Sequence, residues 1–286
     1  MSKPLGLVNR ILPFSAVDGP GNRFVIFLQG CNFNCVNCHN PQTIGVCDVC
    51  GICVEECPGE ALQIKASGTE IEWNKSRCLR CDNCIKVCPS DSNPHSQWLD
   101  VDFVLEKIRR SASFLSGVTV SGGEATQQPE FLRELFHSIK TDSALNHLST
   151  MIDTNGSAEI SIWKSLLPFT DGAMVDLKAF DNQIHQKLTG NSNSQVLQSI
   201  QHLQKAERLF EVRLLIIPDL NDHDLMLQQT ANWLCQLSNN IRIKLIGFRN
   251  HGVRPEYSDF LEATPERLDE IRELFQGFGI QEIKVI

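Results

Sequence analysis

What the sequence lacks limits the classes of protein it can encode. No apolar run among its 286 residues approaches the ~20 residues of a membrane span. Residues 1–10 have neither the apolar core nor the small-residue cleavage site of a secretory signal peptide. No Lys/Arg-rich run occurs and the formal net charge is −8, which disfavours nucleic acid and anionic membranes as partners. We therefore expect a globular, cytoplasmic protein.

The sequence is rich in one residue type, with twelve cysteines. Eleven of them lie between Cys31 and Cys88, and the twelfth, Cys235, stands alone. In a reducing compartment, clustered cysteines bind metal more often than they form disulfides. We expect the eleven to be metal ligands. Cys235 lies within the apolar stripe of a helix and is expected to be a small buried residue.

The fold expected outside the cysteine region is α/β. Several short apolar runs are nearly continuous, as in strands buried on both faces. The expected strands are 24–29, 117–120, 148–152, 172–177, 211–217, 241–248 and 281–286. Amphipathic helices are expected at 101–108 after an N-cap at Asp100, at 227–234, and at 268–275 between Thr264-Pro265 and Gly277. No glycine-rich dinucleotide loop follows the first strand, so a barrel or part-barrel is favoured over a doubly wound sheet.

Residues 45–96 break this pattern and are interpreted as a small inserted domain within a core of 1–44 and 97–286. They hold an internal repeat in which each copy has the form Cys-x2-Cys-x2-Cys-x3-Cys-Pro. This is the bacterial two-cluster ferredoxin pattern, in which the fourth cysteine of each run ligates the other cluster. The predicted [4Fe–4S] ligand sets are Cys47, Cys50, Cys53 and Cys88, and Cys57, Cys78, Cys81 and Cys84. Two structural zinc sites are the alternative, disfavoured by the duplication and by the proline after each run.

A separate trio, Cys31, Cys35 and Cys38, directly follows the first expected strand. Three thiolates would leave one iron of a [4Fe–4S] cluster open, as catalytic metal sites keep a position for substrate. The alternative is a zinc site completed by His39.

The stretch from Phe14 through Asp18 and Gly21 to Cys31, and on to Pro41, resembles the start of the activating enzymes of glycyl radical enzymes. These belong to the radical S-adenosylmethionine (radical SAM) superfamily. The resemblance spans nearly the whole chain outside the insert and is closest to a ferredoxin-containing type of activase. It implies a partial (β/α)6 barrel carrying the inserted ferredoxin-like domain.

The resemblance also implies an activity. The open iron would chelate the amino and carboxylate groups of S-adenosylmethionine, and an electron would split the sulfonium to give a 5′-deoxyadenosyl radical. This radical would take a hydrogen from a glycine of a partner glycyl radical enzyme. It further implies three [4Fe–4S] clusters, sensitivity to oxygen, a donor such as flavodoxin or ferredoxin, and a chain that is monomeric when free.

Site residues can be carried over where motifs match. Gly122, Gly123 and Glu124 match the family's Gly-Gly-Glu motif, and Asp176 and Lys178 match its Asp-x-Lys motif, both contacting S-adenosylmethionine there. Arg213, a costly charge within an apolar strand, matches an arginine on the ligand's carboxylate, with a salt bridge as the alternative. Each short motif would by itself be read as an ordinary turn.

Further residues match with less specific motifs. Asp153, Thr154 and Met174 are candidate ligands of a monovalent cation, and Asp18 matches a position near the substrate peptide, although it also forms an Asp-Gly turn.

The sequence departs from the family in a few places. Ala125 replaces a frequent proline, and Asn37 replaces an aromatic residue that lies near the adenine in many relatives. Arg249, with His251 two residues later, stands where a histidine near the ligand is usual.

Two other classes stay open. A radical SAM enzyme acting on a small metabolite would share the cluster chemistry. A non-catalytic iron–sulfur carrier would use only the insert and would have no need of the trio.

Overall fold

The computed structural model describes residues 3–238 and 240–286. The strands are β1 (Leu5–Ser15), β2 (Arg23–Leu28), β3 (Leu62–Ile64), β4 (Ile71–Trp73), β5 (Gln97–Asp100), β6 (Gly117–Gly122), β7 (Ser149–Thr154), β8 (Gly172–Asp176), β9 (Leu209–Ile216), β10 (Ile243–Gly247) and β11 (Ile283–Val285). The helices are α1 (Ile52–Glu55), α2 (Asn83–Lys86), α3 (Val101–Arg109), α4 (Pro129–Thr141), α5 (Ile160–Leu166), α6 (Asn182–Thr189), α7 (Ser194–Lys205), α8 (Asp224–Leu237) and α9 (Pro265–Gly277). In this described part, no helix combines the length and apolarity needed to cross a bilayer.

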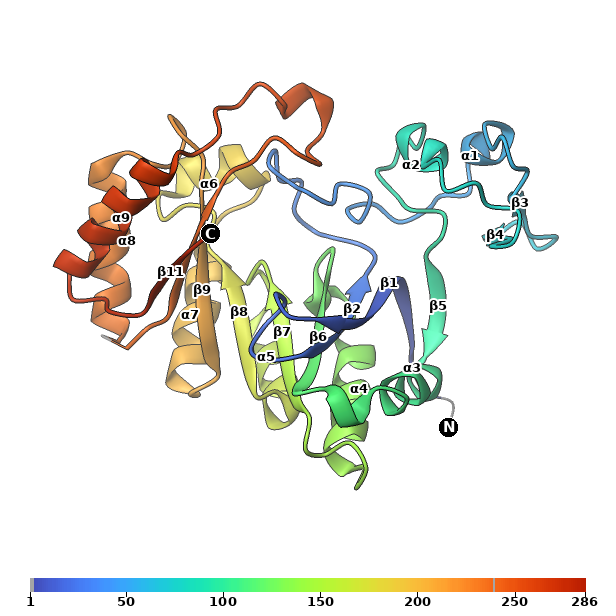
Figure 1. Cartoon of the computed structure of the whole chain (residues 1–286), viewed down its shortest axis with the longest axis horizontal. Coiled ribbons are helices and arrows are strands. Elements are labelled where there is room, and N and C mark those ends of the chain that lie inside the picture. Colours follow the sequence, from blue (N-terminus) through green and yellow to red (C-terminus); the bar gives the residue numbers. More distant parts are fainter. Residues whose placement is uncertain (1–2, 239) are drawn as a thin grey trace.

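One large sheet organises the chain (Figure 1). Its strand order is β11-β10-β9-β8-β7-β6-β2-β1-β5, and the strands from β2 through β6 to β11 pair in parallel. These are the seven strands that the apolar runs predict. Their order never reverses, so right-handed crossovers place the connecting helices on one face. A doubly wound sheet reverses at a switch point. That alternative is therefore wrong, and the sheet is open between β11 and β5.

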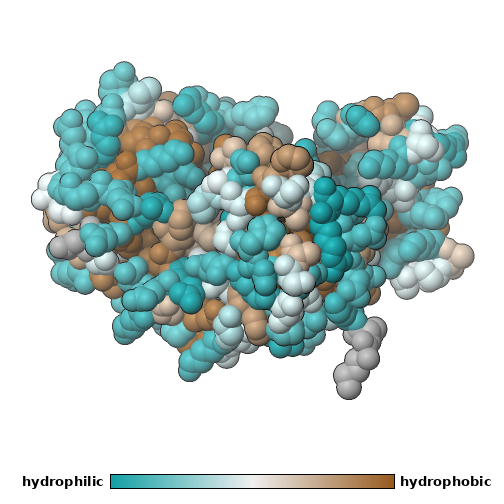
Figure 2. Space-filling model, turned by 60° about the horizontal axis from the view of Figure 1, so that its bottom comes forward, coloured by the Kyte–Doolittle hydropathy of each residue, from teal (hydrophilic) through white to brown (hydrophobic). Residues whose placement is uncertain are grey.

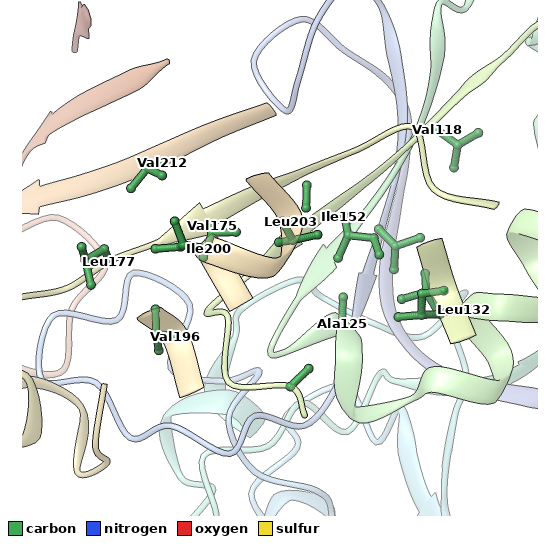
Figure 3. Packing of buried hydrophobic residues seen from close by; sticks show 14 of the residues in the cluster. Val118, Ala125, Leu132, Ile152, Val175, Leu177, Val196, Ile200, Leu203 and Val212 are labelled. Carbon is green, nitrogen blue, oxygen red and sulfur yellow. The ribbon is translucent and has the colours of Figure 1, made fainter. Parts of the chain in front are cut away.

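The main hydrophobic core lies between the sheet and its helices. Strand side chains alternate between the two faces, so every second residue points to the helical side. Figure 3 shows this layer: Val118, Ile152, Val175 and Val212 come from successive strands, and Leu132, Ile200 and Leu203 come from helices α4 and α7. All seven are fully buried. The opposite face of the sheet carries polar groups and a second, smaller apolar cluster that includes Leu215 and Ile217.

The predicted helix starts are confirmed. Asp100 caps α3 by accepting a hydrogen bond from the Phe103 backbone N–H at 2.7 Å, and Thr264 caps α9 through the Arg267 N–H at 3.2 Å. The predicted end of α9 is wrong in detail. Gly277 still belongs to the helix, and the left-handed glycine is Gly279, with φ of 97°. The chain thus turns two residues later than expected.

Two strands of the large sheet, β1 and β5, have no counterpart in the sequence prediction. β1 pairs antiparallel with β2 on one side and with β5 on the other. β1 mixes exposed and buried residues irregularly along its eleven positions and bulges twice against β2. It therefore lacks both the continuous apolar run and the strict alternation from which strands are predicted.

The segment that interrupts the α/β pattern projects from one side of the sheet, at the right of Figure 1. It carries α1, β3, β4 and α2. Its two ends lie side by side, because Thr43 pairs with Ser92 and the Gly45 N–H donates to the Asp91 carbonyl at 3.0 Å. The chain therefore leaves and re-enters the core at one place.

Cys235 differs from its expectation. It lies on α8 at the edge of the main core, half-buried rather than buried. Its thiol donates to the Phe278 carbonyl at 3.0 Å, where the chain leaves α9.

The burial of α4 allows a matched test of the core. Leu135 on α4 is fully buried, whereas Leu225 on α8 is 69% exposed. We expect Leu135→Ala to lower the free energy of unfolding by about 2–5 kcal/mol and Leu225→Ala to change it by less than about 0.5 kcal/mol. Urea unfolding followed by circular dichroism measures both. Equal effects of the two substitutions would contradict the described packing of α4.

Candidate active site

A line of polar side chains crosses the sheet on the face away from the helices. The register pairs Asp153 with Met174, Met174 with Glu211, Asp176 with Arg213, and Arg213 with Lys244. Residues paired across neighbouring strands share a face. These side chains therefore belong to one face, near the edge where the parallel strands end and where barrel enzymes keep their sites.

The cysteine trio follows β2 at the same edge. Its loop is held by backbone hydrogen bonds on both sides: the Cys31 N–H donates to the Ile44 carbonyl at 2.8 Å, and the Val36 N–H donates to Leu188 at 2.9 Å. The eleven cysteines between Cys31 and Cys88 form no disulfide. The trio is thus fixed in place by the fold rather than by covalent pairing.

The three thiols lie in a buried environment beside two cations. Burial raises the pKa of Cys31 to about 12 and of Cys35 to about 11. The positive charges of Lys178 and Arg254 act in the opposite direction on Cys35 and Cys38. A metal centre binds thiolates and releases their protons, and the two cations would favour the resulting negative charge.

His39 does not join the trio. Its Nε2 lies 3.0 Å from the Arg249 carbonyl in the loop after β10, and its ring lies beside Phe248 with centroids 6.1 Å apart. The zinc alternative would require this imidazole to use its other nitrogen or to give up its contact with the Arg249 carbonyl.

The two glycines of the Gly-Gly-Glu motif permit close contact between the end of β6 and the chain around the trio. A Cβ on Gly123 would lie 2.2 Å from the Gly30 carbonyl oxygen, and one on Gly122 would lie 2.2 Å from the Leu28 nitrogen. Gly122 also has a φ of 119°, which L side chains rarely adopt. The Glu124 N–H donates to the Gly30 carbonyl at 2.8 Å. Only glycine fits at both positions.

Glu124 links the end of β6 to the end of β7. Its Oε1 accepts from the Thr126 hydroxyl at 2.6 Å and the Thr154 hydroxyl at 2.7 Å, and its Oε2 accepts from the Asn155 N–H at 2.7 Å. Burial raises the pKa of this carboxyl, while these hydrogen bonds act to lower it. Glu124 therefore positions the strand ends, and its second oxygen keeps a lone pair for another donor.

Arg213 lies at the centre of the charged face. Its guanidinium contacts Asp153 at 2.8 Å, Glu211 at 2.9 Å and the Met174 sulfur at 2.9 Å. The salt-bridge alternative is therefore realised in this structure. Asp153 also accepts from the Ser121 hydroxyl at 2.8 Å.

Asp176 and Lys178 form the second ion pair, with Nζ and Oδ2 2.7 Å apart. Burial acts to raise the pKa of Asp176, but Lys178 and Arg213 outweigh it and hold the pKa below its ordinary value. Since the pKa of Cys35 responds to both residues, the pair lies beside the trio.

Not every candidate joins this group. Thr154 follows Asp153 on β7, so its side chain points to the other face, where it contacts Glu124. The structure brings Asp153 and Met174 together around Arg213 but leaves Thr154 apart. Asp18 lies in the turn between β1 and β2, where its carboxylate accepts from Ser15 and its carbonyl accepts from the Thr119 hydroxyl at 2.7 Å.

The departures from the family pattern also have defined places. Asn37 is buried at 4% exposure, and its Oδ1 has no hydrogen-bond partner in the described chain. Arg249 is exposed and lies 3.8 Å from Glu262, and His251 is exposed nearby in the same loop.

Sequence reasoning missed several residues of the site. Glu211 and Lys244 complete the charged face, with Nζ and Oε1 3.5 Å apart, and each carried the signal that identified Arg213, a charge within a buried strand. Asn155 and Arg254 carried no such signal. Arg254 donates to the Cys35 carbonyl at 3.1 Å and lies 3.4 Å from Asp91, so it joins the trio's loop to the end of the projecting segment.

The projecting segment repeats its backbone as well as its sequence. Val49 and Arg80, the residues before the second cysteine of each run, both have positive φ, and so do Glu60 and Asp91, three residues after the fourth. Each run continues into a four-residue helix, α1 or α2, that carries its third cysteine, and the two helices start with the same backbone hydrogen bonds. The two copies therefore fold alike.

The eight cysteines of this segment line two hollows. One is lined by Cys47, Cys50, Cys53 and Cys88. The other is lined by Cys57, Cys78, Cys81 and Cys84. These are the two sets that the exchanged fourth cysteine predicts. No three His, Cys, Asp or Glu side chains of the described residues converge on one point as ligands of a single ion would.

The contact at Gly123 allows a direct test. We expect Gly123→Ala to lower the free energy of unfolding by about 1–3 kcal/mol, because its Cβ would meet backbone atoms that cannot rotate away. Gly277→Ala is the matched control, since nothing lies within 4 Å of its Cβ position. Urea unfolding compares the two, and an unchanged Gly123→Ala variant would disprove the close contact.

The fold resembles that of two solved structures. A radical SAM methyltransferase from Sphaerobacter thermophilus superposes over 99% of this chain and 77% of its own, with a TM-score of 0.59 and 14% identity. QueE from Escherichia coli covers 99% of this chain and 94% of its own, with a TM-score of 0.56 and 14% identity. At these identities the likeness concerns the fold alone.

Sequence relatives are closer. The (2S)-3-sulfopropanediol dehydratase activating enzyme of Klebsiella oxytoca is 30% identical, over 87% of this chain and 84% of its own. The pyruvate formate-lyase-activating enzyme of Streptococcus mutans is 26% identical, over 99% and 95%. The family model described as "Radical SAM superfamily" matches residues 25–227. The chain therefore belongs to the radical SAM superfamily, and the curated relatives described here are activating enzymes.

Proposed function

We propose that the protein is an activase that cleaves S-adenosylmethionine reductively and removes a hydrogen atom from a glycine of a partner glycyl radical enzyme. The observation that carries this proposal is the half-buried trio Cys31, Cys35 and Cys38, which lies beside the charged Asp176–Lys178 pair of the sheet edge. Relatives of nearly the same length that are named activating enzymes support the partner class.

The residues present fit a [4Fe–4S] cluster at the trio. Its thiols are buried, fixed by backbone hydrogen bonds and placed beside Lys178 and Arg254. When bound, the cluster supplies an open iron for the ligand's amino and carboxylate groups and the electron that splits its sulfonium. The chain's part is to hold both reactants and to exclude water.

The face of the sheet away from the helices, called the inner face below, carries charges of both signs that can bind a zwitterionic ligand. The cations of Lys178 and Arg213 would attract its carboxylate, and Asp176 would accept hydrogen bonds from its ribose hydroxyls. Glu124 would orient the ammonium through its remaining lone pair, and Gly122 and Gly123 would let the backbone approach. Arg213 would exchange contacts with Asp153 and Glu211 for the carboxylate, so part of the binding free energy is spent on breaking ion pairs.

We propose further that residues 45–96 form a ferredoxin-like domain with two closed [4Fe–4S] clusters, as in the ferredoxin-containing type of activase. Two hollows, each lined by the four cysteines of one predicted ligand set, support this assignment. These clusters would relay electrons to the trio from an external donor such as flavodoxin or ferredoxin.

The remaining expectations are also proposals. A cation at Asp153, Thr154 and Met174 would have to displace the guanidinium of Arg213 and reorient Thr154. Asp18 would meet the substrate peptide. The oxygen sensitivity of the clusters places the reaction in an anaerobic cytoplasm, and the free chain would be monomeric.

Anaerobic reconstitution tests the activity. With iron, sulfide, dithionite and S-adenosylmethionine, we expect 5′-deoxyadenosine from the native chain and none from Cys35→Ser, whose trio is incomplete. Cys235→Ser is the matched control and should behave as the native chain. Chromatography measures the product, and its absence from the native chain would refute the proposal.

The partner class needs a second readout. Mixing the reduced protein with candidate glycyl radical enzymes should produce a glycine-centred signal in electron paramagnetic resonance spectra. Deoxyadenosine formed without that signal on any candidate would instead favour a small-molecule substrate.

The exchanged fourth cysteine can be tested by iron content. We expect about twelve irons in the native chain and about eight after loss of one cluster. The pair Cys57→Ser and Cys81→Ser, which come from different runs, should lose the same cluster, so that the double variant loses no more iron than either single one. Cys50→Ser combined with Cys81→Ser should lose both. Additive losses for Cys57 and Cys81 would show that each run ligates its own cluster.

A further inference from the structure

A basic groove lies where the projecting segment meets β1 and α3. The groove is lined by residues of the projecting segment, among them Cys78 and His95, and by residues of the core within 8–13 and 103–111. Its cations are Arg10, Lys75, Arg80, Lys107 and Arg110, and its one acidic residue is Asp82. The chain as a whole carries a formal charge of −8. A groove with four more positive than negative side chains is therefore unusual for this chain. Figure 2 shows one face of the protein, on which hydrophilic residues surround smaller apolar patches.

Most of this charge is not neutralised within the protein. Arg110 pairs with Glu106 one helical turn away. Lys107 lies over the Phe103 ring, 4.6 Å from its centroid. Arg10 and Arg80 are exposed, and no carboxylate of the residues described here forms an ion pair with either. Unpaired surface charges of one sign attract a partner of the opposite sign and speed its association.

The groove opens onto one of the two cysteine sets. Cys78, Asp82 and His95 line both the groove and the hollow of Cys57, Cys78, Cys81 and Cys84. His95 Nε2 lies 3.6 Å from the Cys84 sulfur, and the His95 ring stacks on Trp73 with centroids 4.2 Å apart. A protein bound in the groove would thus approach this cluster closely.

The matching groove on the other set has the opposite character. It is lined by Cys47 and contains Lys65, Glu70 and Glu72 as its charged side chains. Lys65 forms an ion pair with Glu70, which leaves Glu72 in excess. An anionic partner would be repelled here and attracted to the groove at Cys78. The two cysteine sets, which have the same sequence pattern, therefore differ in the charge of the surface beside them.

We propose that the groove between the projecting segment and β1/α3 is the docking site of an acidic, low-potential one-electron carrier protein. This inference rests on the proposed iron–sulfur function of residues 45–96. In each encounter the reduced carrier gives up one electron and is oxidised, and the cluster held by Cys57, Cys78, Cys81 and Cys84 is reduced by that electron. Phe103, 43% exposed, and Leu79, 65% exposed, give apolar contact beside the charges, as expected at a protein interface.

The test uses two double charge reversals on the reconstituted chain. Arg10→Glu with Lys75→Glu alters the groove, and Lys86→Glu with Arg133→Glu makes the same change of net charge at exposed positions outside its lining. Reduced flavodoxin, an acidic one-electron carrier, is the probe. Stopped-flow bleaching of the cluster absorbance gives the second-order rate constant of reduction at low and high salt, and titration calorimetry gives the affinity for oxidised flavodoxin.

We expect the groove variant to lower the rate constant by about tenfold or more at low salt, with a weaker salt dependence and a weaker affinity. The control should stay within about twofold of the native chain. Reduction of the groove variant by dithionite should also stay within about twofold, since a small reductant needs no docking. Equal slowing of both variants, or no slowing of either, would overturn the proposal.

Two further outcomes separate this proposal from the proposed function. Rapid, groove-dependent reduction without deoxyadenosine would uphold the docking site and refute the activase. Conversely, a groove variant that accepts electrons normally but no longer generates the glycine-centred signal with dithionite would assign the groove to the substrate enzyme and overturn the carrier.

Discussion

The close approach of the β6 end to the chain around the cysteine trio is the contact on which the site depends. Gly123 lies against the Gly30 carbonyl with no room for a Cβ, and Glu124 donates its N–H to the same oxygen. The carboxylate of Glu124 then holds the end of β7 through Thr154 and Asn155. Gly122, Gly123 and Glu124 thus fix the position of the cysteine loop relative to the ends of β6 and β7. A substitution at any of the three would therefore shift the cysteines relative to these strands.

Burial of charge is the second constraint. Charges removed from water must be paired, and on the inner face each is paired with a neighbour: Arg213 with Asp153 and Glu211, and Lys178 with Asp176. Such pairs stabilise the buried charges, and they also allow the site to bind a charged ligand. A ligand with its own carboxylate and ammonium can replace one partner of a pair without leaving the other unpaired, whereas an apolar ligand cannot. This favours a zwitterion over other molecules of similar size.

Much of this arrangement can be predicted from local sequence, whereas the rest depends on contacts that form only in the folded chain. Apolar runs predict the seven parallel strands because strands buried on both faces are nearly continuous in sequence, and motifs at their ends meet because parallel strands end at one edge. The irregular pattern of β1 hid an antiparallel strand. Thr154 faces away from Asp153 because β7 extends through both residues, beyond the end of the predicted strand 148–152. Arg254 could not be found at all, because only the folded loop brings it to the Cys35 carbonyl.

The projecting segment shows how a repeat can become asymmetric. Its two runs have left-handed residues at matching positions and matching short helices, so the backbone around the two cysteine sets is alike. The core residues around the two sets are not alike. Three of the five cations in the groove at Cys78 come from the core: Arg10 on β1, Lys107 on α3 and Arg110 at the C-cap of α3. The core adds no charged side chain to the groove at Cys47. Most of the difference therefore arises from how the segment packs on the core, and the rest comes from the segment's own charged side chains. A ferredoxin-like unit free in solution would lack these core cations. Fixing it at this place would make the proposed cluster at Cys78 the preferred entry point for a negatively charged donor.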